Sequence, residues 1–161
     1  QILPAIQTKS GIKISDATTN KWSSVIKPDV FARKLTETNK ANNGKVVPVI
    51  KILKAINSTL PDNSQLSGYH IESMAVNAFK NYSGRKTYYD MVRHLCNYIA
   101  DNVKNPIKDS TGQSIHVDDY LGVTNSIKRQ RIMKSYERVI NRINIAERKF
   151  SVDDFKEIIE D

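Results

Sequence analysis

The fold of this chain is decided by one stretch, Val46–Phe79, which reads VVPVIKILKAINSTLPDNSQLSGYHIESMAVNAF. Apolar residues in its first part recur with the spacing of one helix face, and they are Val49, Ile50, Leu53 and Ile56. After a polar loop, a second apolar helical stripe comprises Met74, Ala75, Ala78 and Phe79. The stretch therefore predicts two amphipathic helices, around which the rest of the chain is organised.

Polar residues of the same stretch are suited to a phosphorylated aromatic ligand. Lys51 and Lys54 are three residues apart on the first helix, so they lie one above the other. Ser67, Gly68 and Tyr69 open the second helix. Lysine is a mobile cation for a phosphate tail, glycine lets a ligand approach the backbone, and a tyrosine ring can stack on a base. The ordinary alternatives are solvated lysines, a capping serine and a core tyrosine.

The composition is that of one compact domain. The chain has 161 residues, of which 39% are hydrophobic and 26% are charged. No apolar run approaches the roughly 20 residues of a membrane helix, and no secretion signal is visible, so we expect a soluble, cytoplasmic protein with no membrane partner. The single cysteine, Cys96, excludes an internal disulfide and a cysteine-based zinc site, and we expect its thiol to be buried.

The formal net charge of +8 favours anionic partners. Nucleotides, nucleic acids and acidic lipid surfaces all fit a surplus of this size. A basic surface that only keeps the protein soluble fits it equally well. The charge therefore indicates a class of partner without choosing among its members.

The segments that flank the central stretch predict a mostly helical bundle of about five to six helices with a short N-terminal β-hairpin. The hairpin is expected in ILPAIQTKSGIKIS, and the residues from Asp16 to Lys27 are expected to be irregular. Trp22 in that irregular part is expected to anchor the core or to cover a loop. We divide the chain into a β element with a linker, residues 1–27, and a helical domain, residues 28–161.

Local signals place the other helices. Proline suits a first helical turn, and Thr87 followed by Asp90 has the spacing of a capping box. The expected helices are Pro28 to about Thr38, Thr87 to about Lys104, one that begins near Asn125, and a short one that begins at Ser151. Residues 105–124 are rich in turn formers and are expected to form a surface loop or two short turns.

The helix that begins near Asn125 combines an apolar stripe with basic faces. The stripe consists of Ile132, Met133, Tyr136, Val139, Ile140, Ile143 and Ala146. The basic residues expected on the other faces are Lys128, Arg129, Arg131, Lys134, Arg138 and Arg142. A solvated basic helix of this kind is one candidate for binding nucleic acid through its phosphates.

Five short segments, taken in order, resemble the C-terminal half of the cGAS/DncV-like nucleotidyltransferases, which are relatives of oligoadenylate synthetases and archaeal-type CCA-adding enzymes. The segments are ILPAI, KWSSVIKPDVFARKL, VIKILKAIN, LSGYHIES and NPIKDSTG. In the family they correspond to the end of a palm strand, the segment that leaves the palm sheet, a lysine-bearing helix, a serine-tyrosine-histidine signature and a loop before the final helices. The resemblance implies a helical lobe of such an enzyme.

The resemblance also implies roles for the central residues. Lys54 matches a lysine that contacts the donor triphosphate, and Lys51 matches a possible second contact. Ser67 or Gly68 matches a position that hydrogen-bonds the phosphates, and Tyr69 matches an aromatic residue that stacks on a base. His70 belongs to the same signature, and we expect it to hold the helix entrance. We expect His94 and His116 to be structural or exposed, because neither has a partner at metal-ligand spacing.

The family's reaction uses two Mg²⁺ ions held by three carboxylates, and this chain lacks the motifs that supply them. The glycine-serine and aspartate-x-aspartate motifs are not visible, and Gln1 falls where the third carboxylate is expected. We therefore predict no catalytic residue and no metal ligand in this chain, and no activity for it alone. It is expected to be a fragment that works with an N-terminal catalytic lobe, or a degenerate relative.

The leading hypothesis is a lobe of a nucleotidyltransferase that makes a cyclic or linear oligonucleotide second messenger from nucleoside triphosphates, as in antiviral defence. Lys51, Lys54, Ser67, Gly68 and Tyr69 would bind the nucleotide. Two alternatives stay open: a non-catalytic basic module that binds nucleic acid, and a lobe of a CCA-adding or poly(A)-type enzyme.

Overall fold

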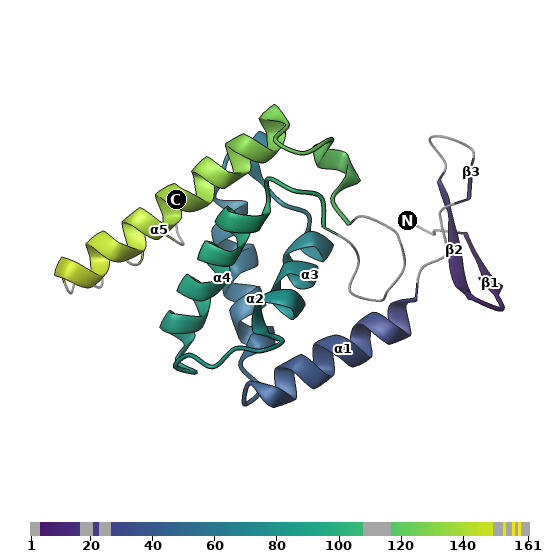
Figure 1. Cartoon of the computed structure of the whole chain (residues 1–161), viewed down its shortest axis with the longest axis horizontal. Helices are drawn as coiled ribbons and strands as arrows, with labels where there is room; N and C mark the ends of the chain where they lie inside the picture. Colours follow the sequence, from purple (N-terminus) through teal and green to yellow (C-terminus); the bar gives the residue numbers. More distant parts are fainter. Residues whose placement is uncertain are drawn as a thin grey trace.

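The computed structural model describes residues 4–16, 21–22, 27–107 and 117–149, together with Asp153, Lys156 and Ile158. Helices dominate this part of the chain, as predicted (Figure 1). The helices are α1 (Pro28–Ala41), α2 (Val46–Ser58), α3 (Gly68–Phe79), α4 (Tyr88–Asn102) and α5 (Ile127–Lys149). Two short 3₁₀ helices, η1 (Asp62–Ser64) and η2 (Asp119–Leu121), lie in the connections.

The predicted hairpin is present and is extended by a third short strand. Strands β1 (Ala5–Thr8) and β2 (Gly11–Asp16) pair antiparallel, and β3 (Lys21–Trp22) pairs with the end of β2. The prediction that residues 16–27 are irregular was therefore wrong at β3. Trp22 is 47% exposed, so it does not anchor the core. Figure 1 shows the strands to one side of the helices, beyond the first turn of α1.

The core forms where α2, α3, α4 and α5 pack together. All the apolar residues predicted to form stripes on the central helices are buried, and Cys96 of α4 is buried with them. On α5 the predicted stripe is buried at Ile132, Tyr136, Val139, Ile143 and Ala146. Each large apolar side chain removed from water contributes about 1.5–3 kcal/mol, so these stripes are the main source of stability.

Capping residues set the helix boundaries. The hydroxyl of Thr87 accepts a hydrogen bond from the Asp90 amide at 3.1 Å, which confirms the predicted start of α4. Helix α1 runs three residues beyond the expected Thr38, because the buried side-chain amide of Asn42 donates to the carbonyls of Thr38 and Phe79. The chain then turns through Gly44, whose φ of 74° suits glycine.

The connection between α4 and α5 is not simply a surface loop. In its described part, residues 105–107 and 117–126, both Asp118 and Leu121 are buried. Asp118 is therefore buried although it is a turn former, whereas Asp119, Gly122 and Asn125 are exposed as a surface segment requires. The structural reason is a buried ion pair, described below.

The expected last helix lies mostly outside the described residues. The backbone is helical at Asp153, Lys156 and Ile158, and Ile158 belongs to the core. Within the described ranges, no helix combines the length and the apolar character needed to cross a membrane.

Candidate functional site

The N-terminus of α3 is exposed and sharply capped. Ser67 precedes the helix in an extended conformation, and its hydroxyl accepts a hydrogen bond from the amide of His70 at 3.2 Å. Ser67 and Gly68 are both exposed to solvent. The positive end of the helix dipole is therefore accessible, and such an end favours an anion.

Lys54 of α2 reaches this helix end. Its Nζ lies 2.6 Å from Oε1 of Glu72, one turn into α3. A Cβ built on Gly68 would lie 3.4 Å from both Cε and Nζ of Lys54, so the lysine passes directly over the glycine. The absence of a side chain at residue 68 leaves room for this approach. The structure therefore brings together Lys54, Gly68 and the helix cap Ser67.

Lys51 occupies a different environment. It is exposed on α2, and none of the ion pairs among the described residues includes it. The two lysines that the sequence treats as a pair thus differ, because only Lys54 is directed to α3 by a partner on that helix. Whether Lys51 contacts a ligand stays a prediction.

Tyr69 adds an aromatic surface beside the helix cap. Its ring centroid lies 4.9 Å from that of Phe31 on α1, with the ring planes tilted by 56°. Tyr69 is 44% exposed, and the two rings line a pocket of about 430 Å³ with Lys27 and Pro28. The wall of this pocket is apolar and aromatic, as stacking of a planar base requires.

His70 lies under the helix end. It is fully buried, and its Nδ1 lies 3.0 Å from the hydroxyl of Tyr120 in η2. Burial lowers the pKa of His70 to about 4, with the Asp118 carboxylate opposing this shift and the Arg129 guanidinium adding to it. The imidazole is therefore neutral near pH 7. The expectation that His70 holds the helix entrance agrees with these contacts.

The Tyr120 hydroxyl also accepts a hydrogen bond from the amide of Ser67 at 3.0 Å. One oxygen from η2 thus contacts both the cap and the first turn of α3. Sequence reasoning missed Tyr120, because it lies among the turn formers between α4 and α5 and its distance along the chain from Ser67 hides the contact.

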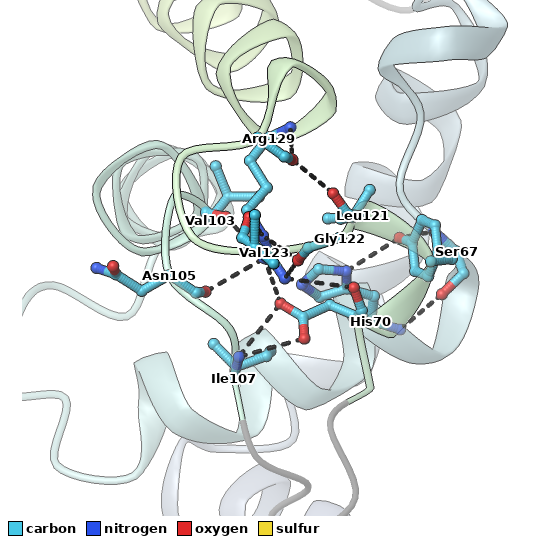
Figure 2. A network of polar contacts seen from close by, with 12 residues as sticks. Ser67, His70, Val103, Asn105, Ile107, Leu121, Gly122, Val123 and Arg129 are labelled. Carbon is cyan, nitrogen blue, oxygen red and sulfur yellow. Dashed lines mark hydrogen bonds and ion pairs between the residues drawn. The ribbon is translucent and has the colours of Figure 1, made fainter.

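A buried ion pair holds η2 in place. Arg129 Nη1 lies 2.6 Å from Oδ2 of Asp118, and neither side chain is exposed to solvent. Figure 2 shows Arg129 directed toward the backbone of Gly122 and Val123. Nη1 also donates to the carbonyl of Val103, Nε donates to the carbonyls of Gly122 and Val123, and Nη2 donates to that of Gly122. The carboxylate of Asp118 also accepts from the amide of Ile107.

The prediction that Arg129 belongs to the solvated basic face was wrong. Arg129 precedes Ile132 by three residues and Tyr136 by seven, so it continues the buried stripe of α5. That spacing was the available signal. The hydrogen bonds to carbonyls and to Asp118 make burial of the charge possible.

The other candidate residues give a mixed result. His94 is structural, because its Nε2 lies 3.0 Å from the carbonyl oxygen of Ala78. Gln1 and His116 lie outside the described residues. Over the ranges that are described, no three His, Cys, Asp or Glu side chains form a group that could hold a metal ion.

No curated protein was found to match the chain. A sequence model of the cGAS/DncV-like nucleotidyltransferase C-terminal helical domain matches residues 33–144. The match includes α2, α3, α4 and most of α1 and α5, and therefore all the contacts around the N-terminus of α3 that involve Lys54, Tyr120 and Arg129. The chain belongs to the family of C-terminal helical domains of cGAS/DncV-like nucleotidyltransferases.

Proposed function

We propose that the first turn of α3, together with Lys54, binds the triphosphate of a nucleoside triphosphate. The observation that carries this proposal is the approach of the Lys54 ammonium to Gly68 at an exposed, positively polarised helix end. The ammonium, the helix dipole and the hydroxyl proton of Ser67 all favour a polyanion at one place. The half-exposed Lys54–Glu72 pair can open to phosphate oxygens, because neither charge is locked away from water.

The base of the nucleotide would lie against Tyr69. The exposed ring of Tyr69 and the adjacent ring of Phe31 present an aromatic wall one residue from the phosphate-binding turn. A stacked base contributes about 1–3 kcal/mol in comparable sites. The separation of a cationic subsite from an aromatic one matches the two ends of a nucleotide.

The chemistry itself is assigned to an N-terminal catalytic lobe, which the family implies for a domain of this kind. We propose that the Mg²⁺ ions are held by that lobe, since the described residues of this chain contain no suitable cluster. The residues described here would bind and orient the nucleotide so that an incoming hydroxyl meets its α-phosphate, with pyrophosphate as the leaving group. The exposed side chains of Ile6 and Trp22 offer apolar area for contact with that lobe.

We further propose a cyclic or linear oligonucleotide second messenger as the product, and a role in antiviral signalling. Both the product and the role are proposed from the family, and neither is argued from a contact in the structure. An RNA end, as in CCA-adding or poly(A)-type enzymes, is the alternative substrate. Analysis of the products formed by the intact enzyme from labelled nucleoside triphosphates distinguishes the two.

Nucleotide binding is tested with two lysine variants of the intact protein. We expect Lys54→Ala to weaken binding of nucleoside triphosphates about tenfold, because it removes one charge-assisted contact worth about 1.5 kcal/mol and leaves Glu72 beside the phosphates. Lys134→Ala, which removes an exposed lysine from α5, is the control for the loss of one positive charge, and we expect a smaller effect. Titration monitored by NMR or calorimetry provides the affinities.

Equal losses in the two variants would indicate a diffuse charge effect and would contradict the proposal. Stronger binding of nucleic-acid polymers than of triphosphates, with a steep decrease at high salt, would instead favour the basic face of α5. Arg129 is buried and does not belong to that face, which still has the exposed residues Lys128, Arg131, Lys134 and Arg138.

A further inference from the structure

The hydroxyl of Tyr120 bridges two parts of the α3 N-terminus. It lies 3.0 Å from the amide nitrogen of Ser67 and 3.0 Å from Nδ1 of His70. Figure 2 shows His70 and Ser67 at this helix end, close to the segment that contains Gly122. The contact joins η2 to α3 at the point where the proposed nucleotide site begins.

The direction of one of these hydrogen bonds follows from the chemistry of the groups. The Ser67 amide can only donate, so the Tyr120 oxygen accepts from it. Nδ1 of His70 accepts from the Tyr120 hydroxyl in one tautomer of the imidazole and donates to it in the other, and the bond from Ser67 to the Tyr120 oxygen is compatible with both. Nε2 of His70 is buried without a hydrogen-bond partner among the described residues. Phenylalanine at residue 120 could make neither bond.

Further contacts hold both elements that the Tyr120 hydroxyl joins, η2 and the N-terminus of α3. On the η2 side, the buried Arg129 binds the Asp118 carboxylate and the Gly122 carbonyl, which lie two residues before and two residues after Tyr120 in the chain. On the α3 side, the side chain of Asn57 accepts from the amide of Leu66 at 2.8 Å and donates to its carbonyl. Ser67 is therefore fixed between α2 and η2.

We propose that Tyr120 is a positioning residue for phosphate binding, because it holds Ser67 and the first turn of α3 in the orientation that faces Lys54. This inference rests on the proposed function. Tyr120 does not contact the phosphates; it acts through Ser67. Its loss should weaken binding of the phosphate chain and leave stacking of the base on Tyr69 unchanged.

The test compares Tyr120→Phe with Tyr82→Phe in the intact protein. Tyr82 is a suitable control because its hydroxyl also makes a hydrogen bond, to the carbonyl of Arg85 at 2.8 Å, but at the other end of α3. The probes are a nucleoside triphosphate, inorganic tripolyphosphate and the corresponding nucleoside. We expect Tyr120→Phe to weaken binding of the first two about fivefold, which corresponds to the lost hydrogen bond to Ser67, and to leave nucleoside binding unchanged. Tyr82→Phe should bind all three like the wild type.

Equal weakening of the nucleoside and of tripolyphosphate would mean that the variant only loosens the fold, and it would overturn the proposal. Unchanged tripolyphosphate binding in Tyr120→Phe, when Lys54→Ala has lost it, would overturn the inference and leave the proposed function intact. No effect of Lys54→Ala would instead remove the proposed function itself.

A second measurement applies even if Tyr120→Phe does not fold. Amide hydrogen exchange at Ser67 in the wild-type protein, followed by NMR, reports on the bond to Tyr120 directly. The proposal requires slow exchange of this amide although Ser67 is exposed, because the Tyr120 oxygen accepts its hydrogen. Exchange as fast as in an unstructured chain would contradict it.

Discussion

Two ion pairs support the first turn of α3, and they share a distance but not an environment. Both the Lys54–Glu72 pair and the Arg129–Asp118 pair have a nitrogen–oxygen distance of 2.6 Å. The side chains of the first pair are 40% and 28% exposed, whereas those of the second are not exposed at all. The first can exchange its partner for a ligand. The second cannot do so without leaving a charge buried.

The largest effect should come from breaking the buried pair. We expect Arg129→Met to reduce the free energy of unfolding by about 3–5 kcal/mol, because Asp118 and several carbonyl groups would lose their buried partner. Arg131→Met, two residues away on the exposed face of α5, is the matched control and should change it by less than about 0.5 kcal/mol. Urea denaturation followed by circular dichroism measures both.

Equal stability of the two arginine variants would show that the buried pair is replaceable by apolar packing. The two ion pairs would then differ in their exposure to solvent but not in their contribution to stability. A variant with both Arg129→Met and Asp118→Leu sharpens this point. Recovery of most of the lost stability would assign the cost to the unpaired charge rather than to packing.

The next effect depends on pH and reports on the buried region through His70. Its pKa is lowered from 6.5 to about 4 in the folded protein, so the unfolded chain binds a proton more readily. Stability is therefore highest above pH 6.5 and falls as the pH decreases toward 4, by about 3 kcal/mol from this group. The groups around His70 are Asp118, Arg129 and Tyr120.

His70→Gln isolates this contribution. The variant should be less stable than the wild type at pH 7, but the difference between the two proteins should shrink as the pH falls to about 4. Denaturation at several pH values measures this difference directly. The carboxylates titrate in both proteins, so their contribution to stability cancels. A difference that does not change with pH would mean that His70 has the same pKa in the folded and unfolded states, and it would contradict the expected lowering of that pKa by burial.

Most of the fold follows from patterns along the sequence. The apolar stripes of α2, α3, α4 and α5 predict which faces are buried, and the Thr87–Asp90 capping box predicts where α4 begins. These features are local, since helix periodicity and capping depend on residues a few positions apart. Strand β3 was missed because a two-residue strand has no period of its own.

Only the exposed residues of the candidate site had been named from the sequence, and their role in binding stays a prediction. One continuous stretch of sequence contains Lys54, Ser67, Gly68 and Tyr69. The structure places Lys54 against the N-terminal end of α3, where the other three residues lie. Tyr120 and Asp118 act through contacts with residues far away along the chain, which no local pattern encodes. The spacing of Arg129 was a local signal for burial, but its positive charge favoured a solvated position. Burial is possible because the buried Asp118 carboxylate pairs with it.

The smallest effect should come from the exposed pair, and it sharpens the comparison most directly. A double-mutant cycle of Lys54→Ala and Glu72→Ala should give a coupling energy of about 0.2–1 kcal/mol, several times less than the cost of Arg129→Met. Because both charges are in contact with water, high salt should reduce this coupling, whereas salt cannot reach the buried pair. Denaturation at low salt and at 1 M salt, roughly a 3 Å screening length, measures the difference. A coupling of several kcal/mol that persists at high salt would mean that Lys54 is locked to Glu72, and a locked lysine could not turn to a phosphate.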